Sequence, residues 1–225
     1  SIAVSTGTET NQTHISFGAV NSEGIIDNNK YNRYNFTFRN SWDIVKNVLS
    51  MDMGLFYIKQ NNQNSNGQGM YYNPLVPIYL FPPSDDINKY AVYERYDADR
   101  NFKTQYWPYG NQGLGMQNPY WIINRNMFNT DRDRYIISLS MKWNITNWLN
   151  IIGRARIDNA YTDFERKLYA STDGLFAKSQ GNYMNQEDKN TSTYLDFLVN
   201  VDKKFGENYH LLVNLGGSFY DEKYK

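Results

Sequence analysis

The segment YIISLSMKWNITNWLNIIGRARI, Tyr135–Ile157, decides the fold. In its first run, Tyr135–Ile145, apolar and aromatic side chains occupy every second position, and most of the positions between them are polar. The same period of two continues in Leu149–Ile157, where Arg154 and Arg156 take the opposite side. Side chains alternate between the two faces of a β-strand, so each run predicts a strand with one apolar face. The short connection between the runs predicts an antiparallel hairpin.

The length of both runs indicates what surrounds them. Strands of soluble proteins usually have about 5–6 residues, whereas a strand that crosses a bilayer needs roughly 9–11. Both runs reach the longer range, and their apolar sides carry no Lys, Arg, Asp or Glu. A charge that faces lipid at mid-bilayer costs about 2–4 kcal/mol, whereas one that faces water costs little. We therefore expect the apolar faces to contact lipid and the polar faces to line an aqueous interior.

Composition supports this interpretation and excludes others. The 225 residues include 23 basic and 23 acidic side chains, so no charge excess favours a nucleic-acid partner. Mean hydropathy is −0.71 although 16% of the residues are aromatic, 20 of them Tyr. Alternating strands with aromatic rims give this combination. The absence of Cys excludes disulfides and thiolate metal sites, and no apolar run approaches the ~20 residues of a membrane helix.

Six further segments have strand character, and the connections alternate in length. The segments are Ile2–Thr8, Thr13–Val20, Tyr31–Val45, Val48–Gln60, Thr191–Phe205 and Tyr209–Tyr220. Short connections (9–12, 46–47, 146–148, 206–208) alternate with long ones (21–30, 61–125, 171–190). Outer-membrane barrels have short turns on one side and long extracellular loops on the other. In a soluble domain, a connection as long as 61–125 would count against the assignment.

Aromatic residues gather at both ends of the apolar faces, as in the aromatic girdles of membrane barrels. They are Trp42, Trp143, Phe205 and Tyr209 near the short turns, and Tyr34, Tyr57, Tyr135 and Phe219 at the opposite ends. We therefore predict an all-β fold of about eight up-and-down antiparallel strands, a segment of a larger transmembrane β-barrel. The alternative is a soluble β-sandwich with aromatic edges.

Four segments carry a resemblance to a known family: NNKYNRYNFTFRN (28–40), NPLVPIYLFPPSDD (73–86), QYWPYGNQGLGMQNPYW (105–121) and WLNIIGRARIDN (148–159). Together they resemble the barrel of the SusC/RagA family of TonB-dependent outer-membrane transporters, and its starch-utilisation branch in particular. The resemblance covers nearly the whole chain. It implies that residues 1–225 are part of a single 22-stranded-type barrel domain. Neither a signal peptide nor the family's plug domain is recognisable in the sequence.

The resemblance also implies a function. Members of the family import oligosaccharides, or in some cases peptides, across the bacterial outer membrane. A SusD-like lipoprotein covers the barrel, and TonB supplies energy through the plug. We expect import of starch-derived oligosaccharides. Two other classes remain open from the residues alone: a soluble, lectin-like carbohydrate-binding domain and a structural, adhesin-type β-protein.

The long connection supplies the candidates for contact with substrate or lid, because aromatic rings stack on the apolar faces of sugars and amides pair with hydroxyls. The candidates are Tyr79, Phe81, Tyr106, Trp107, Tyr109, Asn118, Tyr120 and Trp121. The amides Asn111, Gln112 and Gln117 lie among them. Four prolines stiffen this region, which favours the alternative that the aromatic residues pack on one another or against the lid.

The remaining candidates are charges on the polar faces, which we expect to bond one another, a plug domain or substrate. They are Arg33, Arg39, Arg154, Arg156, Asp158, Asp196 and Asp202. We expect no catalytic residue, because no GxSxG motif occurs and His14 and His210 lie in strands beside turns. We expect no cofactor and no metal site, since the loop acidic pairs (85–86, 97 with 99) lack EF-hand spacing.

Overall fold

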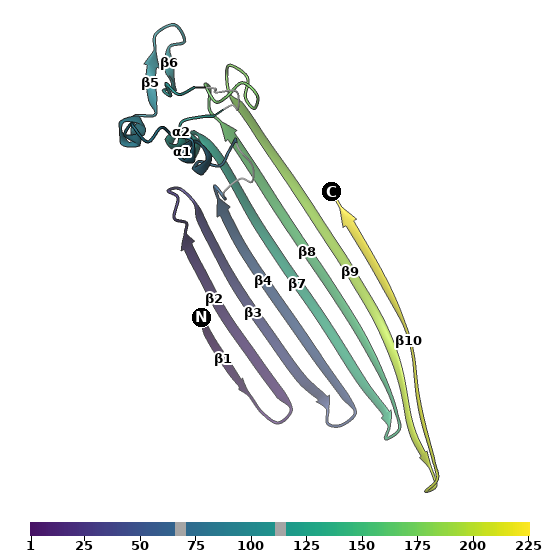
Figure 1. Ribbon diagram of the computed structural model, residues 1–225. Helices are drawn as coiled ribbons and strands as arrows, with labels where there is room; N and C mark the ends of the chain where they lie inside the picture. Colours follow the sequence, from purple (N-terminus) through teal and green to yellow (C-terminus); the bar gives the residue numbers. More distant parts are fainter. Residues whose placement is uncertain (66–70, 111–115) are drawn as a thin grey trace.

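The computed structural model describes residues 1–65, 71–110 and 116–225, and its main feature is one antiparallel sheet of eight strands (Figure 1). The strands are β1 (Ile2–Gly7), β2 (Asn11–Glu23), β3 (Lys30–Val45), β4 (Leu49–Gln63), β7 (Asn126–Thr146), β8 (Leu149–Leu168), β9 (Asn182–Phe205) and β10 (Tyr209–Tyr224). They lie in that order across the sheet, each beside its neighbour in the sequence. The prediction of about eight up-and-down strands is confirmed.

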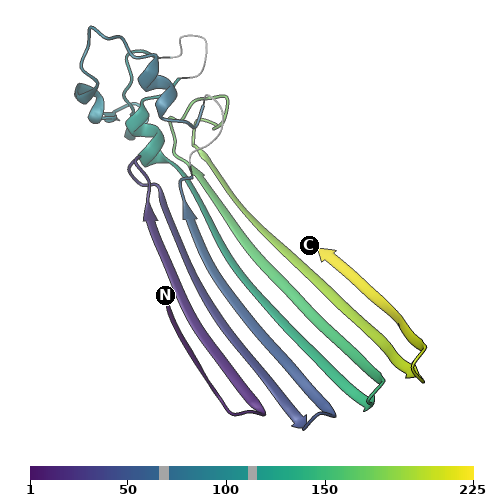
Figure 2. The same ribbon diagram turned by 60° about the horizontal axis from the view of Figure 1, so that its bottom comes forward.

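The described part of the long connection between β4 and β7 contains five short elements. They are α1 (Leu75–Tyr79), the 3₁₀ helix η1 (Ile87–Ala91), the hairpin strands β5 (Glu94–Asp97) and β6 (Phe102–Gln105), and α2 (Pro119–Arg125). They gather at the end of the sheet opposite the short turns (Figures 1 and 2). The alternation of short and long connections therefore places every long connection at the same end. In the described part of the chain, no helix is both long enough and apolar enough to span a bilayer.

Strand register sorts the side chains into two faces. Directly paired residues of neighbouring strands share a face, and we call such a set a row. One row contains Phe38, Leu55, Ile137 and Ile157. The adjacent row contains Arg39, Gly54, Ser138 and Arg156, which project to the other side of the sheet. The apolar face predicted from single strands is thus continuous across the sheet, and its large side chains remain exposed.

The apolar band crosses the sheet obliquely. The row of Tyr57 and Tyr135 continues through Asn159 and Thr191 to Lys223, so it is aromatic on β4 and β7 and polar from β8 onward. On β10 the apolar stretch extends only as far as Phe219, which lies four positions before Lys223 (223 − 219 = 4). The end of the apolar band is therefore shifted against the strand register between β4 and β10. Strands that tilt against a barrel axis require such a stagger between register and membrane level.

The predicted strand ends need correction on the side of the long connections. β7 begins at Asn126 and β8 runs to Leu168, well beyond the predicted Tyr135 and Ile157. The predicted loop 171–190 is shorter, because β9 begins at Asn182. In these extensions polar residues predominate on both faces and the few apolar ones do not alternate, so the strands continue through their backbone ladder where no apolar alternation marks them.

The short turns have clear local causes. Asn47, between β3 and β4, has a φ of 61°, and Gly206, between β9 and β10, also has a φ of 61°. Gly and Asn adopt this left-handed region at the lowest cost. β-Bulges adjoin two of these turns, at 43–45 and 144–146. Tight turns of this kind fix the register of the hairpins that they join.

The buried side chains lie almost entirely at the long-loop end. Among the described residues, and apart from prolines such as Pro77 and Pro119, the buried apolar ones are Tyr90, Trp121, Ile122, Ala160, Leu168 and Ala177. The broad middle of the sheet contributes none of them. The sheet therefore has no core of its own within this chain, whereas the loops that cover its end do.

Candidate functional site

The described parts of the three long connections meet in one folded unit, which we call the loop cap. It comprises residues 24–29, 64–65, 71–110, 116–125 and 169–181. The Asn28 amide donates to the carbonyl of Ile123 at 3.1 Å and to Asn124 Oδ1 at 2.9 Å. The backbone N–H of Gln105 donates to Ser171 Oγ at 2.8 Å. Segments far apart in the sequence are thus hydrogen-bonded to one another, and the cap forms a folded surface at one end of the sheet.

Asn118 and Trp121 form the interior of the loop cap. The Asn118 side chain is 0% exposed and donates to the carbonyls of Tyr90 (2.9 Å) and Tyr106 (3.0 Å). Its oxygen also caps α2 by accepting from the backbone N–H of Tyr120 at 2.8 Å. Trp121 is 1% exposed and donates to Thr172 Oγ1 at 3.1 Å. Because both side chains are enclosed and hydrogen-bonded, they stabilise the cap and do not reach a ligand at its surface.

A second group, the aromatic cluster, surrounds the carboxylate of Asp85. Its rings are Phe81, Tyr90, Trp107 and Tyr109, with centroids 5.1–6.1 Å apart. The hydroxyls of Tyr90 and Tyr109 both donate to Asp85 Oδ2, and Lys89 Nζ donates to Oδ1 at 2.8 Å. Edge-to-face packing at these distances stabilises aromatic pairs. The three predicted contact residues in this cluster, Phe81, Trp107 and Tyr109, therefore pack against one another with much of their ring surface.

The electrostatics of the aromatic cluster follow from these hydrogen bonds. Donation from Lys89, Tyr109 and Tyr90 holds the pKa of the Asp85 carboxyl well below its usual range. The same contact with Asp85 raises the pKa of Tyr109 and of Tyr90, because a phenolate beside a carboxylate is disfavoured. At neutral pH the carboxylate is therefore ionised and both phenols are protonated.

The other predicted contact residues lie in different surroundings. Tyr79 is 83% exposed at the end of α1. The Arg95 guanidinium covers Tyr106, 3.3 Å from its ring centroid, and Tyr120 is half-buried in the first turn of α2. Of the amides, Gln117 is buried and accepts from the Asp173 N–H at 3.2 Å. Asn111 and Gln112 lie outside the described residues. The structure does not bring the eight candidates together into one site.

A small pocket lies where the loop cap meets the sheet, and the sequence analysis missed it. Its volume is about 170 Å³, and it is lined by Asn62, Ser65, Tyr72, Phe128, Thr130 and Phe164. Asn62, Thr130 and Phe164 are directly paired on the polar face of β4, β7 and β8. Tyr72 packs edge-on against Phe128 at 5.2 Å. An aromatic residue on an otherwise polar strand face was the signal in the sequence that could have revealed it.

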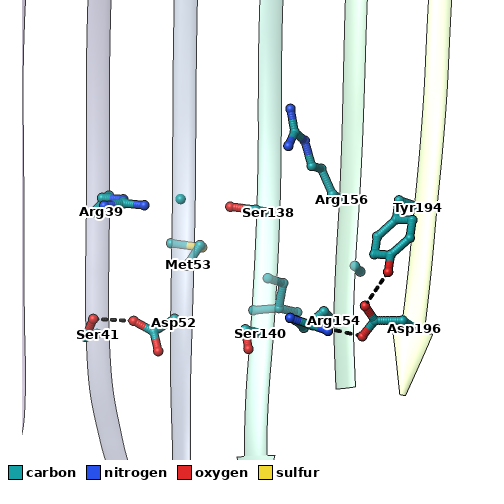
Figure 3. A pocket seen from close by; sticks show the side chains of 13 residues that line it. Arg39, Ser41, Asp52, Met53, Ser138, Ser140, Arg154, Arg156, Tyr194 and Asp196 are labelled. Carbon is teal, nitrogen blue, oxygen red and sulfur yellow. Dashed lines mark hydrogen bonds and ion pairs between the residues drawn. The ribbon is translucent and has the colours of Figure 1, made fainter. Parts of the chain in front are cut away.

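A wider groove, of about 510 Å³, lies lower on the polar face (Figure 3). It contains four of the seven predicted charges on that face, Arg39, Arg154, Arg156 and Asp196. Arg154 donates to Asp196 at 2.9 Å, and the Tyr194 hydroxyl donates to the same carboxylate at 2.6 Å. Cross-strand pairs of opposite charge offset one another, and a wall that faces water can carry charged side chains at low cost.

The remaining predicted charges share this polar face. Arg33 donates to Asn35 at 2.9 Å, and Asp202 pairs with His210 at 2.5 Å near the short turns. Asp158 accepts from Arg134 at 2.7 and 2.5 Å. All seven charges thus lie opposite the apolar face, and most are engaged with neighbouring side chains.

Within residues 1–65, 71–110 and 116–225, no three His, Cys, Asp or Glu side chains gather closely enough to hold a metal ion. Asp85 and Asp86, one of the two acidic pairs in the long connection, have other partners. Asp85 is occupied by the aromatic cluster, and Asp86 accepts from the Asn88 N–H at 3.0 Å. Ser5 Oγ and His14 Nδ1 lie 2.8 Å apart and are exposed.

Comparison with known proteins supports the fold. No protein-family model matches the sequence, and a search of curated proteins found no match. Among solved structures, the closed form of the ferric-catecholate import receptor Fiu from E. coli K12 aligns over 99% of this chain, with a TM-score of 0.55 and 12% identity. The open form aligns over 99% with a TM-score of 0.52 and 10% identity.

The chain spans 29% and 32% of those two receptor chains. At 10–12% identity the likeness is one of fold. The chain therefore shares the fold of part of those receptors and is a segment of a larger antiparallel β-barrel, as the strand pattern predicted. These comparisons do not support the resemblance to the SusC/RagA family, and they support neither glycan cargo nor a SusD-like partner.

Proposed function

We propose that this chain forms part of the barrel wall of a bacterial outer-membrane importer that takes its energy from TonB. The observation that carries the proposal is the separation of the two faces over eight paired strands, with all long connections at one end. An apolar outside and a polar inside suit a wall between lipid and a water-filled passage. The loop cap would then face the exterior, where cargo arrives.

We propose oligosaccharides, and malto-oligosaccharides from starch first, as the cargo. The resemblance to the SusC/RagA family suggested this class. The pocket between cap and wall supports it, because Phe128, Phe164 and Tyr72 offer ring faces while Asn62 and Thr130 offer hydrogen-bonding groups. Sugar rings present apolar C–H faces and hydroxyls side by side, so they match a surface that mixes rings with amides.

We also propose that a SusD-like lipoprotein binds the loop cap at α1. Leu75, Ile78, Tyr79 and Leu80 are exposed there, between 39% and 83%. Exposed apolar side chains that lie close together are typical of protein contact sites. Tyr79 is the most exposed of the four and would contribute most, because tyrosine is enriched among residues that dominate binding energy.

The test uses the full-length protein in its native membrane. Uptake of fluorescent maltohexaose is measured with the wild type, with Phe164→Ala and with Ile136→Ala. Ile136 also projects from the polar face but does not line the pocket, so it serves as the matched control. We expect Phe164→Ala to lower the apparent affinity about tenfold and the control to change it little. Equal effects of the two substitutions would remove the pocket from the cargo path.

A second cargo class, ferric-catecholate complexes, is favoured by the aromatic rings of the same pocket, because catechols are aromatic and can stack on Phe128 and Phe164. The similar solved structures are ferric-catecholate import receptors. Uptake of labelled ferric catecholate and of short peptides by the same strain separates the three cargoes. A protein that stays monomeric without detergent and binds glycan would instead favour the soluble, lectin-like alternative.

A further inference from the structure

The groove in Figure 3 contains two arginines whose hydrogen-bonding groups are largely unused. Arg39 of β3 and Arg156 of β8 belong to one row, and the residues between them are Gly54 and Ser138. Neighbouring strands lie about 4.8 Å apart, so roughly three such spacings separate the two arginine backbones. Figure 3 shows Arg39 reaching sideways toward β4 and Arg156 leaning toward β7. The two guanidinium groups thus flank the same stretch of wall.

In their row, the wall between the two arginines carries only Gly54 and Ser138. Gly54 is buried, and a Cβ placed there would lie 2.7 Å from Ser138 Oγ, so the Ser138 hydroxyl occupies the space over the glycine. No larger residue fits at position 54 without moving Ser138. The Ser138 hydroxyl lines the groove, and neither residue of the row has a long side chain. A ligand of a few atoms can therefore approach this hydroxyl between the arginines.

Neither arginine is satisfied by the wall. Within the described residues, Arg39 has no carboxylate partner, and its guanidinium lies 5.6 Å from the ring centroid of Phe56. Arg156 reaches Asp158 at 3.3 Å, but Arg134 already holds that carboxylate at 2.7 and 2.5 Å. A guanidinium has five N–H donors. Most of those on Arg39 and Arg156 have no hydrogen-bond partner within the described residues.

The acidic groups of the groove are already engaged elsewhere. Asp52 accepts a hydrogen bond from the Ser41 hydroxyl. Asp196 accepts from both Arg154 and Tyr194. These carboxylates belong to the next row on the same face, with Arg154 between them. In that row Arg154 is paired with Asp196, whereas the row of Arg39 and Arg156 contains no carboxylate on β3, β4, β7 or β8.

We propose that Arg39 and Arg156, together with the Ser138 hydroxyl that lies over Gly54, bind a carboxylate group on the polar face. The planar fork of a guanidinium matches a carboxylate with two parallel hydrogen bonds. The same wall already contains this pairing, because Arg134 holds Asp158 through two nitrogens. The carboxylate comes either from an acidic side chain elsewhere in the full protein or from a dissolved acid. The site requires only that this face be wet and does not depend on which cargo is imported.

The test uses the full-length protein in detergent, with citrate as the free carboxylate. Binding is followed by calorimetry and by the thermal unfolding midpoint for the wild type, Arg39→Gln, Arg156→Gln and Arg33→Gln. Arg33 projects from the same face, does not line the groove and donates to Asn35, so Arg33→Gln is the matched control. Arg39→Lys is added because it keeps the charge but loses the fork.

Two results support the site and distinguish the source of the carboxylate. If the acid is dissolved, citrate binds the wild type, and either Gln substitution weakens binding about tenfold or more, with Arg39→Lys in between. If the protein supplies its own carboxylate, citrate does not bind the wild type. Arg39→Gln and Arg156→Gln then lower the unfolding midpoint and speed proteolysis, while Arg33→Gln does neither. Failure of both patterns, with the groove variants behaving as Arg33→Gln does, overturns the assignment without bearing on cargo uptake.

Discussion

The eight-stranded wall exposes its large apolar side chains, whereas the loop cap encloses several of its own. In the wall, Ile137, Leu139 and Trp143 project away from the polar face and remain exposed, Trp143 by 52%. In the loop cap, Trp121 is enclosed and its indole N–H is hydrogen-bonded. The wall buries its polar backbone in the strand ladder and turns its apolar surface outward, as a bilayer requires.

Each region is therefore suited to its own surroundings, the apolar face of the wall to lipid and the loop cap to water. The wall needs lipid to cover its apolar face, because an apolar surface of this extent is not tolerated in water. The loop cap follows the rules of a small soluble domain, with a tryptophan in its core and polar groups paired inside. Matched substitutions in the two regions should therefore fail differently, and this contrast can be measured.

The largest effect is expected for Trp121→Ala. Removing a buried tryptophan typically costs about 3–5 kcal/mol, and here it also leaves Thr172 without its donor. We expect the loop cap to open while the wall keeps its ladder. Hydrogen exchange read by mass spectrometry should show faster exchange over 71–110 and 116–125 but not over β7 and β8. Trp143→Ala is the matched control, and its effect should be smaller and should appear only when lipid or detergent is changed.

Leu139→Arg should come next. Leu139 lies in the middle of the apolar band, so an arginine there would face lipid and cost about 2–4 kcal/mol. Its neighbour Ser140 projects to the polar face, and Ser140→Arg should cost little. Unfolding in lipid vesicles by guanidinium measures both. Equal costs would mean that the two faces do not meet different solvents, and the importer proposal would lose its basis.

Asn118→Ala should destabilise the loop cap to a smaller extent. It removes the cap of α2, worth about 0.5–2 kcal/mol, and leaves the carbonyls of Tyr90 and Tyr106 unpaired. Asn118→Asp keeps the capping oxygen but loses the amide donor, so it separates the two contributions. Protease sensitivity of the cap in the full protein measures both variants. Wild-type resistance in Asn118→Ala would contradict the interior role of this residue.

The smallest expected effect concerns pH. Because the pKa of Asp85 is lower in the folded cap than in an unfolded chain, its ionised form stabilises the cap above the usual Asp pKa of about 3.9. That contribution is lost as pH falls through the lowered pKa. Proteolysis of the cap should therefore increase in acid for the wild type, whereas Asp85→Asn should remove this dependence. An identical acid response in both proteins would exclude Asp85 as its source.

Much of the wall could be predicted from the residues, and the reasons are local. Alternation in Tyr135–Ile157 identified the strands, their hairpin and their two faces because a strand has a period of two. The strand extensions to Asn126 and Leu168 could not be seen, since polar residues predominate on both of their faces and no apolar alternation marks them. The oblique course of the apolar band also required the register, because no single strand carries information about its neighbours.

The candidate site was less predictable, because contacts between distant residues define it. The sequence marked the aromatic residues of the long connection but not their roles. It could not indicate that Trp121 is enclosed by a loop some 50 residues away, or that Tyr90 and Tyr109 share the carboxylate of Asp85. The pocket of Tyr72, Phe128 and Phe164 likewise forms only when the cap folds onto the strand ends.

By itself, the sequence determined that the chain is all-β, that its strands have one apolar and one polar face, and that its long connections lie at one end. These features follow from side-chain periodicity, which is a property of neighbouring residues. The tertiary structure was needed to show which aromatic side chains are buried and which are exposed. It was also needed to show which arginines of the polar face have N–H donors without a partner in the wall. Those outcomes depend on register and on packing between segments distant in the chain, where burial and hydrogen bonding, not local pattern, set the free energy.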